Sequence, residues 1–143
     1  MSSIIRVKRL RPNARLPLRA TESATGLDLY ACLGAAVTLG PDVTLVGTGV
    51  AIEAPVGLDV QIRPRSGLSK QGVMAVLGTI DADYRGELFV AMHTFGSLKA
   101  YEIKDGDRIA QLVITRHEPV ELVETDDLNV SLRGAGGYGS TGR

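Results

Sequence analysis

The sequence has one cysteine, no surplus of either charge and no long apolar run, and each shortage excludes a class of protein. Cys32 alone cannot form an internal disulfide, which favours a reducing compartment. The longest apolar runs are far shorter than the ~20 residues that a membrane-spanning helix needs. Because 16 basic residues balance 16 acidic ones, no global field would hold nucleic acid or an anionic membrane. We therefore expect a soluble, cytoplasmic protein that binds a small partner locally.

Three common kinds of catalytic site are also missing from the sequence. His93 and His117 have no second His or Cys at ligand spacing, so we expect no zinc site. Ser66 has no histidine in a recognisable triad arrangement. The glycine-rich C-terminal tail lacks the G-x-x-x-x-G-K-[ST] spacing of a Walker loop. Any hydrolytic chemistry must therefore use other groups.

The pattern of apolar residues predicts one domain built from short strands. A chain of 143 residues is too short for two independent cores. Apolar and polar residues alternate strictly over 58–63, and similar runs occupy 43–52, 88–93 and 109–115 between turn residues. The only expected helix is a short one over 66–71, ended by Gly72. These features predict an all-β, jelly-roll-like sandwich or barrel with one short helix.

The first nineteen residues are basic and contain no acid. Pro12 and Pro17 would break an amphipathic helix, and no apolar h-region is present, so we do not interpret this stretch as a transit peptide. Ile5, Val7 and Leu10 fit a first strand better.

Two carboxylates, Asp81 and Asp83, stand beside Tyr84 and Arg85 in the segment 78–87. If the segment is extended, both carboxylates share a face, and if it is a turn, they diverge. On these residues alone an acidic turn is the simpler interpretation.

Four other segments contain residues that could form part of a binding site. The segment 63–68 brings Arg65 and Ser66 to the start of the expected helix, although a plain strand-to-helix corner capped by Ser66 is as good an interpretation. The segment 106–112 leads from a turn into a strand, with an Asp107–Arg108 surface pair as the simpler explanation. The segment 24–31 reads as a strand with one acid, and the tail 133–143 would be mobile by itself, because glycine fills half of its last ten positions.

Taken in order, these five segments resemble the five motifs of the trimeric dUTP pyrophosphatase family. The resemblance rests on Arg65-Ser66-Gly67, on the run Ile80 to Gly86 and on the tail from Arg133 to Gly142. It implies a jelly-roll subunit over 1–132, a glycine-rich arm over 133–143 that closes the active site, and a homotrimer with sites at subunit interfaces. It also implies hydrolysis of dUTP to dUMP and pyrophosphate, which keeps uracil out of DNA and supplies dUMP for thymidylate synthesis.

The resemblance assigns a role to each matching residue. Asp81 would be the base that activates water for attack on the α-phosphorus, and Asp28 would hold Mg²⁺ through water. Tyr84 would lie under the deoxyribose and exclude a 2′-hydroxyl. The other implied substrate contacts are Arg65, Ser66, Gly67 and Gln111 to phosphates, Arg133, Gly139, Ser140 and Thr141 to the γ-phosphate end, Tyr138 stacked on uracil, and the backbone of Val76, Leu77, Gly78 and Thr79 around the uracil edge.

The sequence leaves two alternative functions open. A dCTP deaminase of the same superfamily would use a glutamate in the strand after the third motif, where this chain has Ala91. A catalytically inactive nucleotide-binding trimer is the other alternative, since a fold alone does not fix a function.

Overall fold

The computed structural model describes residues 2–142, and that part of the chain forms eleven strands and one helix. The strands are β1 (Arg6–Arg9), β2 (Leu27–Tyr30), β3 (Val37–Leu39), β4 (Thr44–Gly47), β5 (Val50–Glu53), β6 (Leu58–Arg63), β7 (Val73–Ala75), β8 (Gly78–Ile80), β9 (Phe89–Thr94), β10 (Tyr101–Ile103) and β11 (Arg108–Arg116), and the helix is α1 (Ser66–Gln71). Gly72 ends α1 in the left-handed conformation at φ 95°. The prediction of an all-β fold with one short helix is confirmed.

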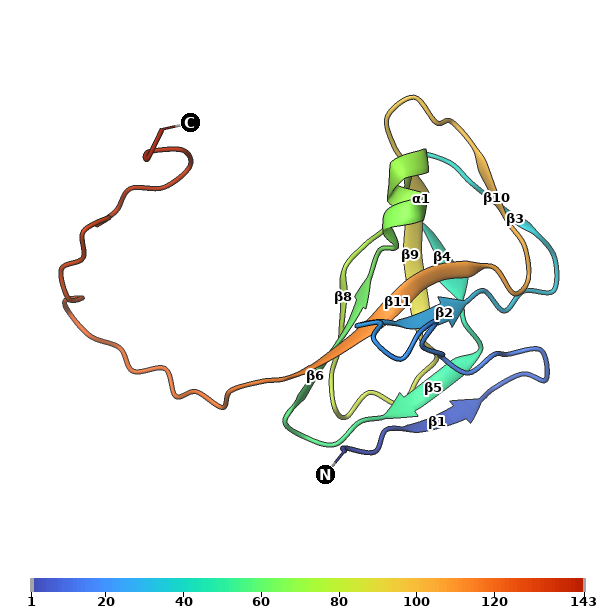
Figure 1. Ribbon diagram of the computed structural model, residues 1–143, viewed down its shortest axis with the longest axis horizontal. Helices are drawn as coiled ribbons and strands as arrows, with labels where there is room; N and C mark the ends of the chain where they lie inside the picture. The colour runs from blue at the N-terminus through green and yellow to red at the C-terminus, as the bar shows by residue number, and fades with distance from the viewer. Residues whose placement is uncertain (1, 143) are drawn as a thin grey trace.

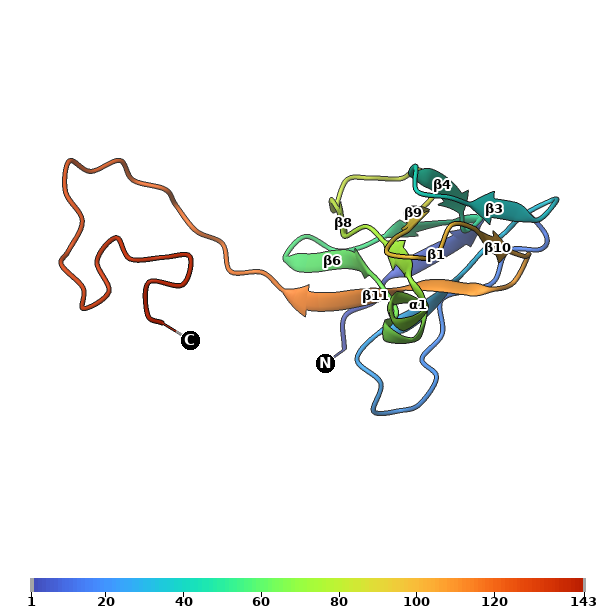
Figure 2. The same cartoon turned by 90° about the horizontal axis from the view of Figure 1, so that it is seen from above.

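The paired strands of the described chain are all antiparallel and form four open sheets. The two larger sheets have the orders β2-β11-β6-β8 and β4-β9-β7, and the pairs β1-β5 and β3-β10 are separate. Figure 2 shows β6 and β11 in one layer and β3, β4 and β9 in another. Side chains of both layers form one core, whose fully buried members include Leu29, Val46, Val60, Val90, Met92 and Ile109.

The apolar run 43–52 forms two strands rather than one. Thr48 and Gly49 separate β4 from β5, and Gly49 has φ +67°. A Cβ atom at Gly49 would lie 2.7 Å from Cys32 Sγ, so this turn needs glycine for its conformation and for its space. Because the apolar pattern continues across the turn, alternation alone does not reveal the break.

The segment Val76 to Thr79, expected around the uracil edge, does not join two strands that pair with each other. β7 pairs with β9, whereas β8 pairs with β6 in the other large sheet. The connection at Val76 and Leu77 therefore carries the chain from one sheet to the other. The Val76 N–H donates to the Ala91 carbonyl at 2.8 Å, which fixes the start of this connection to β9.

Beyond β11 the chain leaves the layers and runs along an extended path of its own (Figures 1 and 2). After His117, the hydrogen bonds of the described tail residues are local, such as Gly136 N–H to Arg133 O at 3.1 Å. Apolar side chains on this path are exposed, Leu122 at 93% and Val130 at 100%.

Within residues 2–142 no helix has the length and apolar character that crossing a membrane requires.

Candidate active site

Asp28 on β2 lies between two arginines. Arg65 Nε is 3.5 Å from Asp28 Oδ1, and Arg108 Nη1 is 3.5 Å from Asp28 Oδ2. Only 14% of the Asp28 side chain is exposed, so much of the carboxylate is screened from water by its neighbours. Two guanidinium groups therefore flank one carboxylate here, and guanidinium groups bind phosphate oxygens well.

Gln111 on β11 joins the same cluster. It lies opposite Asp28 across the β2–β11 pair, and its Nε2 donates to the Pro64 carbonyl at 3.0 Å. A Cβ atom at Gly26 would lie 2.0 Å from Gln111 Oε1, so only glycine at that position leaves room for the side chain. The segments 24–31, 63–68 and 106–112 therefore meet in one chain.

The start of α1 differs from the capped corner considered above. The N-cap is Arg65, with φ −95° and ψ 130°, and it makes no side-chain cap hydrogen bond. Ser66 is instead the first helical residue, and both Ser66 and Gly67 are exposed. The Leu68 N–H donates to the Arg65 carbonyl at 3.1 Å, so in this first turn the N–H groups without a partner inside the helix are those of Ser66 and Gly67.

Arg108 was not among the residues predicted for the site. The expected Asp107–Arg108 surface pair is wrong, because Asp107 Oδ2 accepts the Lys104 N–H at 2.8 Å while Arg108 turns to Asp28. Strand register could have revealed this residue, because Arg108 begins β11 and β11 lies next to β2, the strand that carries Asp28.

Asp81 and Asp83 lie in a turn, which is the simpler of the two interpretations given above. Asp81 directly follows β8, and its carbonyl accepts the Tyr84 N–H at 3.0 Å to close the turn. Asp83 lines a surface cavity of about 620 Å³ with Arg6 and Glu53, whereas Asp81 does not line it. Of the two residues, only Asp83 therefore borders this cavity.

The ring of Tyr84 is fixed by its own loop. Its hydroxyl donates to the Glu87 carbonyl at 2.8 Å. A Cβ atom at Gly86 would lie 2.4 Å from that hydroxyl, so the glycine gives the ring its place on the backbone. The ring is 42% exposed and can still contact a ligand.

The predicted residues do not all meet within one chain. Asp28 on β2 and Asp81 after β8 lie at opposite edges of the four-stranded sheet. Three inter-strand steps separate these edges, which is about 14 Å. The predicted tail residues are exposed and lie on the extended path away from the strands (Figure 1); they are Arg133, Tyr138, Gly139, Ser140 and Thr141.

The described residues include no group of three or more His, Cys, Asp or Glu side chains that could enclose a metal ion. The single carboxylate of Asp28 instead fits Mg²⁺, which keeps several waters and is bound through one or two carboxylates together with ligand phosphates.

Comparison with known proteins agrees with the geometry. A family model described as dUTPase matches residues 12–142. The deoxyuridine 5'-triphosphate nucleotidohydrolase of Hydrogenobaculum sp. (strain Y04AAS1) is 48% identical over 140 residues, which cover 95% of this chain and 96% of the relative.

Solved structures show the same fold. The dUTPase of Staphylococcus bacteriophage 80alpha, solved with dUPNHPP, has a TM-score of 0.87 and 30% identity, covering 99% of this chain and 100% of the phage chain. A point mutant of the dUTPase from S. aureus phage phi11, described with a structural Mg(II) ion, has a TM-score of 0.77 and 26% identity, covering 87% and 97%. The family model and the 48% identical relative each span nearly the whole sequence, and the chain therefore belongs to the dUTPase family.

Proposed function

We propose that the protein hydrolyses dUTP to dUMP and pyrophosphate. The observation that carries this proposal is the meeting of Asp28, Arg65 and Gln111 in one chain that belongs to the dUTPase family. An arginine-rich corner with one shielded carboxylate suits a triphosphate and a metal ion together.

The reaction requires a base beside the innermost phosphate. Asp81 accepts a proton from water while the water oxygen bonds to the α-phosphorus, and the bond from that phosphorus to the bridging oxygen breaks. The electron pair of that bond leaves with pyrophosphate. Holding water and phosphate in line removes much of the entropic barrier, so Asp81 also acts by position.

The phosphates are bound by the corner around Asp28. Arg65, Ser66, Gly67 and Gln111 contact the phosphate oxygens, and Arg108 holds Asp28 in place. Asp28 would hold Mg²⁺ through water, and that ion supplies charge neutralisation on the phosphates.

The nucleoside is selected by residues 76–84. Tyr84 lies under the deoxyribose and leaves no room for a 2′-hydroxyl. Because the Val76 N–H already donates to Ala91, uracil contacts come from the Val76 carbonyl and from the backbone of Leu77, Gly78 and Thr79. Cytosine reverses the donor and acceptor at positions 3 and 4, so it would leave buried groups unpaired.

The complete site requires several chains, which we propose form a homotrimer in a reducing cytoplasm. The separation of Asp28 from Asp81 across the sheet supports this assembly, as do the exposed apolar side chains of the tail. The segment 133–143 then closes over a bound triphosphate, with Tyr138 on the uracil. Arg133, Gly139, Ser140 and Thr141 contact the γ-phosphate end.

Deamination of dCTP is not favoured. Ala91 on β9 carries a methyl group that cannot transfer a proton, and its carbonyl is occupied by the Val76 N–H. Ammonia released from dCTP by the purified protein would support the deaminase alternative.

The deciding experiment measures pyrophosphate release from dUTP, dTTP, dCTP and UTP in parallel, with and without Mg²⁺. We expect release from dUTP alone, dependent on Mg²⁺. A folded, Mg²⁺-supplied protein that binds dUTP without cleaving it would establish the inactive nucleotide-binding alternative.

A further inference from the structure

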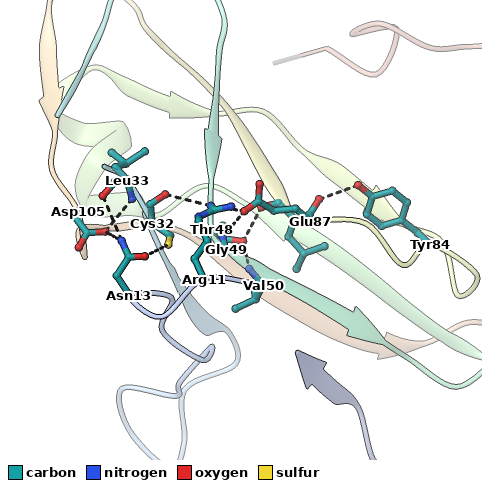
Figure 3. Close-up of polar contacts among 11 residues, drawn as sticks. Arg11, Asn13, Cys32, Leu33, Thr48, Gly49, Val50, Tyr84, Glu87 and Asp105 are labelled. Atoms are coloured by element: carbon teal, nitrogen blue, oxygen red, sulfur yellow. Dashed lines mark hydrogen bonds and ion pairs between the residues drawn. The ribbon is translucent and has the colours of Figure 1, made fainter. Parts of the chain in front are cut away.

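Glu87 ends the loop that carries Asp81 and Tyr84, and its carboxylate is held from two sides. It accepts a hydrogen bond from the Gly49 N–H at 2.8 Å and forms an ion pair with Arg11 (Figure 3). Only 12% of the Glu87 side chain is exposed. A carboxylate this shielded depends on its partners, because a buried charge left unpaired is strongly unfavourable.

Arg11 comes from the basic N-terminal stretch, just before residue 12, where the match to the family model begins. Its Nη2 also donates to the Cys32 carbonyl at 3.4 Å. The hydrogen bond to Glu87, with a further one to Cys32, raises the pKa of Arg11 above its ordinary value. A Cβ atom at Gly47 would lie 3.2 Å from Arg11 Nη2 and 3.3 Å from Glu87 Oε2, so the pair lies close against β4.

The loop that carries Arg11 is itself fastened to the body of the protein. Asn13 Nδ2 donates to Asp105 Oδ1 at 3.1 Å, and the same oxygen accepts the Leu33 N–H at 2.9 Å. Cys32 Sγ donates to Asn13 Oδ1 at 3.2 Å. Figure 3 shows these contacts as one chain from Asp105 to Tyr84, so Arg11 is a fixed support rather than a free arm.

The position of the Tyr84 ring depends on this support. The ring hydroxyl donates to the Glu87 backbone carbonyl, and the Glu87 side chain fixes that backbone to Gly49 and Arg11. The next residue, Leu88, stays paired through its N–H with the Val50 carbonyl at 2.8 Å, so loss of the ion pair would loosen Glu87 itself and, with it, the acceptor that holds the ring.

We propose that Arg11 and Glu87 are positioning residues that hold Tyr84 where it excludes a ribose 2′-hydroxyl. The role assigned to the pair rests on the proposed function, in which the ring lies under the deoxyribose. Exclusion by contact fails when the ring can retreat by about an ångström, since a small displacement in a site is enough to admit a hydroxyl or misalign a substrate.

The test compares kcat/KM for dUTP and UTP in the full-length wild type, in Arg11→Met and in Glu87→Ala. We expect the ratio of kcat/KM for dUTP to that for UTP to fall by about tenfold or more in both variants. Arg11→Lys keeps a cation opposite Glu87 and should restore much of the ratio.

Glu53→Gln is the matched control. Glu53 pairs with Arg85 of the same loop at 3.7 Å, but both side chains are about half exposed, so its loss should leave the ratio unchanged. Glu87→Gln is a milder variant, because it keeps an acceptor for the Gly49 N–H, and it replaces Glu87→Ala if that variant does not fold. It should show an intermediate loss.

Hydrogen–deuterium exchange separates this role from the proposed function. Residues 81–87 should exchange faster in Arg11→Met than in the wild type, whatever the substrate. The proposed positioning role would be overturned if folded Arg11→Met and Glu87→Ala proteins kept the wild-type ratio of kcat/KM for dUTP to UTP and the wild-type exchange rate of residues 81–87. Absence of dUTP cleavage by the wild type would instead overturn the proposed function, and the exchange data would still decide whether the pair holds the loop.

Discussion

Asp28 illustrates how single residues prepare this site. Its carboxylate lies 3.5 Å from each of two guanidinium groups, those of Arg65 and Arg108. Charges held in place before binding need little reorganisation during a reaction, which is the physical basis of electrostatic preorganisation. A protein without net charge can therefore still present a pair of arginines to a triphosphate.

Asp81→Asn tests the proposed base. Asparagine has a similar shape but cannot accept the proton, so turnover should fall about 100-fold or more while affinity stays within about tenfold. Pyrophosphate release gives the turnover, and calorimetry with a non-hydrolysable dUTP analogue gives the affinity. Asp83→Asn, in the same turn, is the control and should retain turnover. Near-normal turnover in Asp81→Asn would remove Asp81 from the mechanism.

Gly49→Ala and Gly57→Ala form a matched pair for stability. Both glycines have positive φ, +67° and +96°, but an added Cβ meets Cys32 and Ala14 only at Gly49. Gly57→Ala should cost about 1–2 kcal/mol from backbone strain, and Gly49→Ala should cost clearly more because a clash is added. Urea unfolding measures both, and equal losses would show that the clash is relieved by movement.

At the scale of elements, the sequence predicts strands where alternation is complete and fails where the chain changes sheets. The alternating apolar residues Val60 and Ile62 define β6, and Gly72 marks the end of α1. The break at Gly49 and the crossing at Val76 are set by contacts with distant residues, Cys32 and Ala91. Such contacts are not visible in a local pattern.

Some residues of the candidate site could be predicted from the sequence and others could not. The motif resemblance supplied Asp28, Arg65 and Gln111, which the fold brings together. Arg108 and the Arg11–Glu87 pair depend on strand register and loop packing, so no spacing in the sequence points to them. Their partners are distant in the chain, as Arg11 is from Glu87, and so lie beyond the reach of any local rule.

Deletion of the residues after Leu132 tests the tail as an element. Among the removed residues that the structure describes, all but the half-buried Gly136 are exposed, so the melting temperature should change by no more than about 2 °C. Turnover of dUTP should fall by about tenfold or more, because a closing segment completes the site. Calorimetry and pyrophosphate release measure the two effects, and unchanged turnover in the truncated protein would contradict the closing role.

At the scale of the whole molecule, the opposite edges of one sheet carry groups that the proposed reaction needs together. A homotrimer has a mass of about 45 kDa, three times the 15.1 kDa of the chain. Sedimentation analysis should give this mass, and a stable species of 15.1 kDa with full activity would contradict shared sites.

Mixing two impaired variants tests the sharing of sites directly. Asp81→Asn chains carry an intact tail, and chains that end at Leu132 carry an intact Asp81. If Asp81 and the tail of one site come from different chains, an equal mixture that is unfolded and refolded together should recover about a quarter of wild-type sites. Sites built within single chains would give no activity beyond that of the two variants refolded separately.

The exposed tail also affects how the purified protein is stored and how proteases degrade it. Backbone that forms only local turns is the first part of a fold that proteases cut. A single cleavage between 117 and 132 would leave the strands and their melting behaviour intact while removing the segment proposed to close the site. A stored sample cleaved in this way would lose its activity while its melting temperature stayed unchanged. The intact mass of each preparation should therefore be checked.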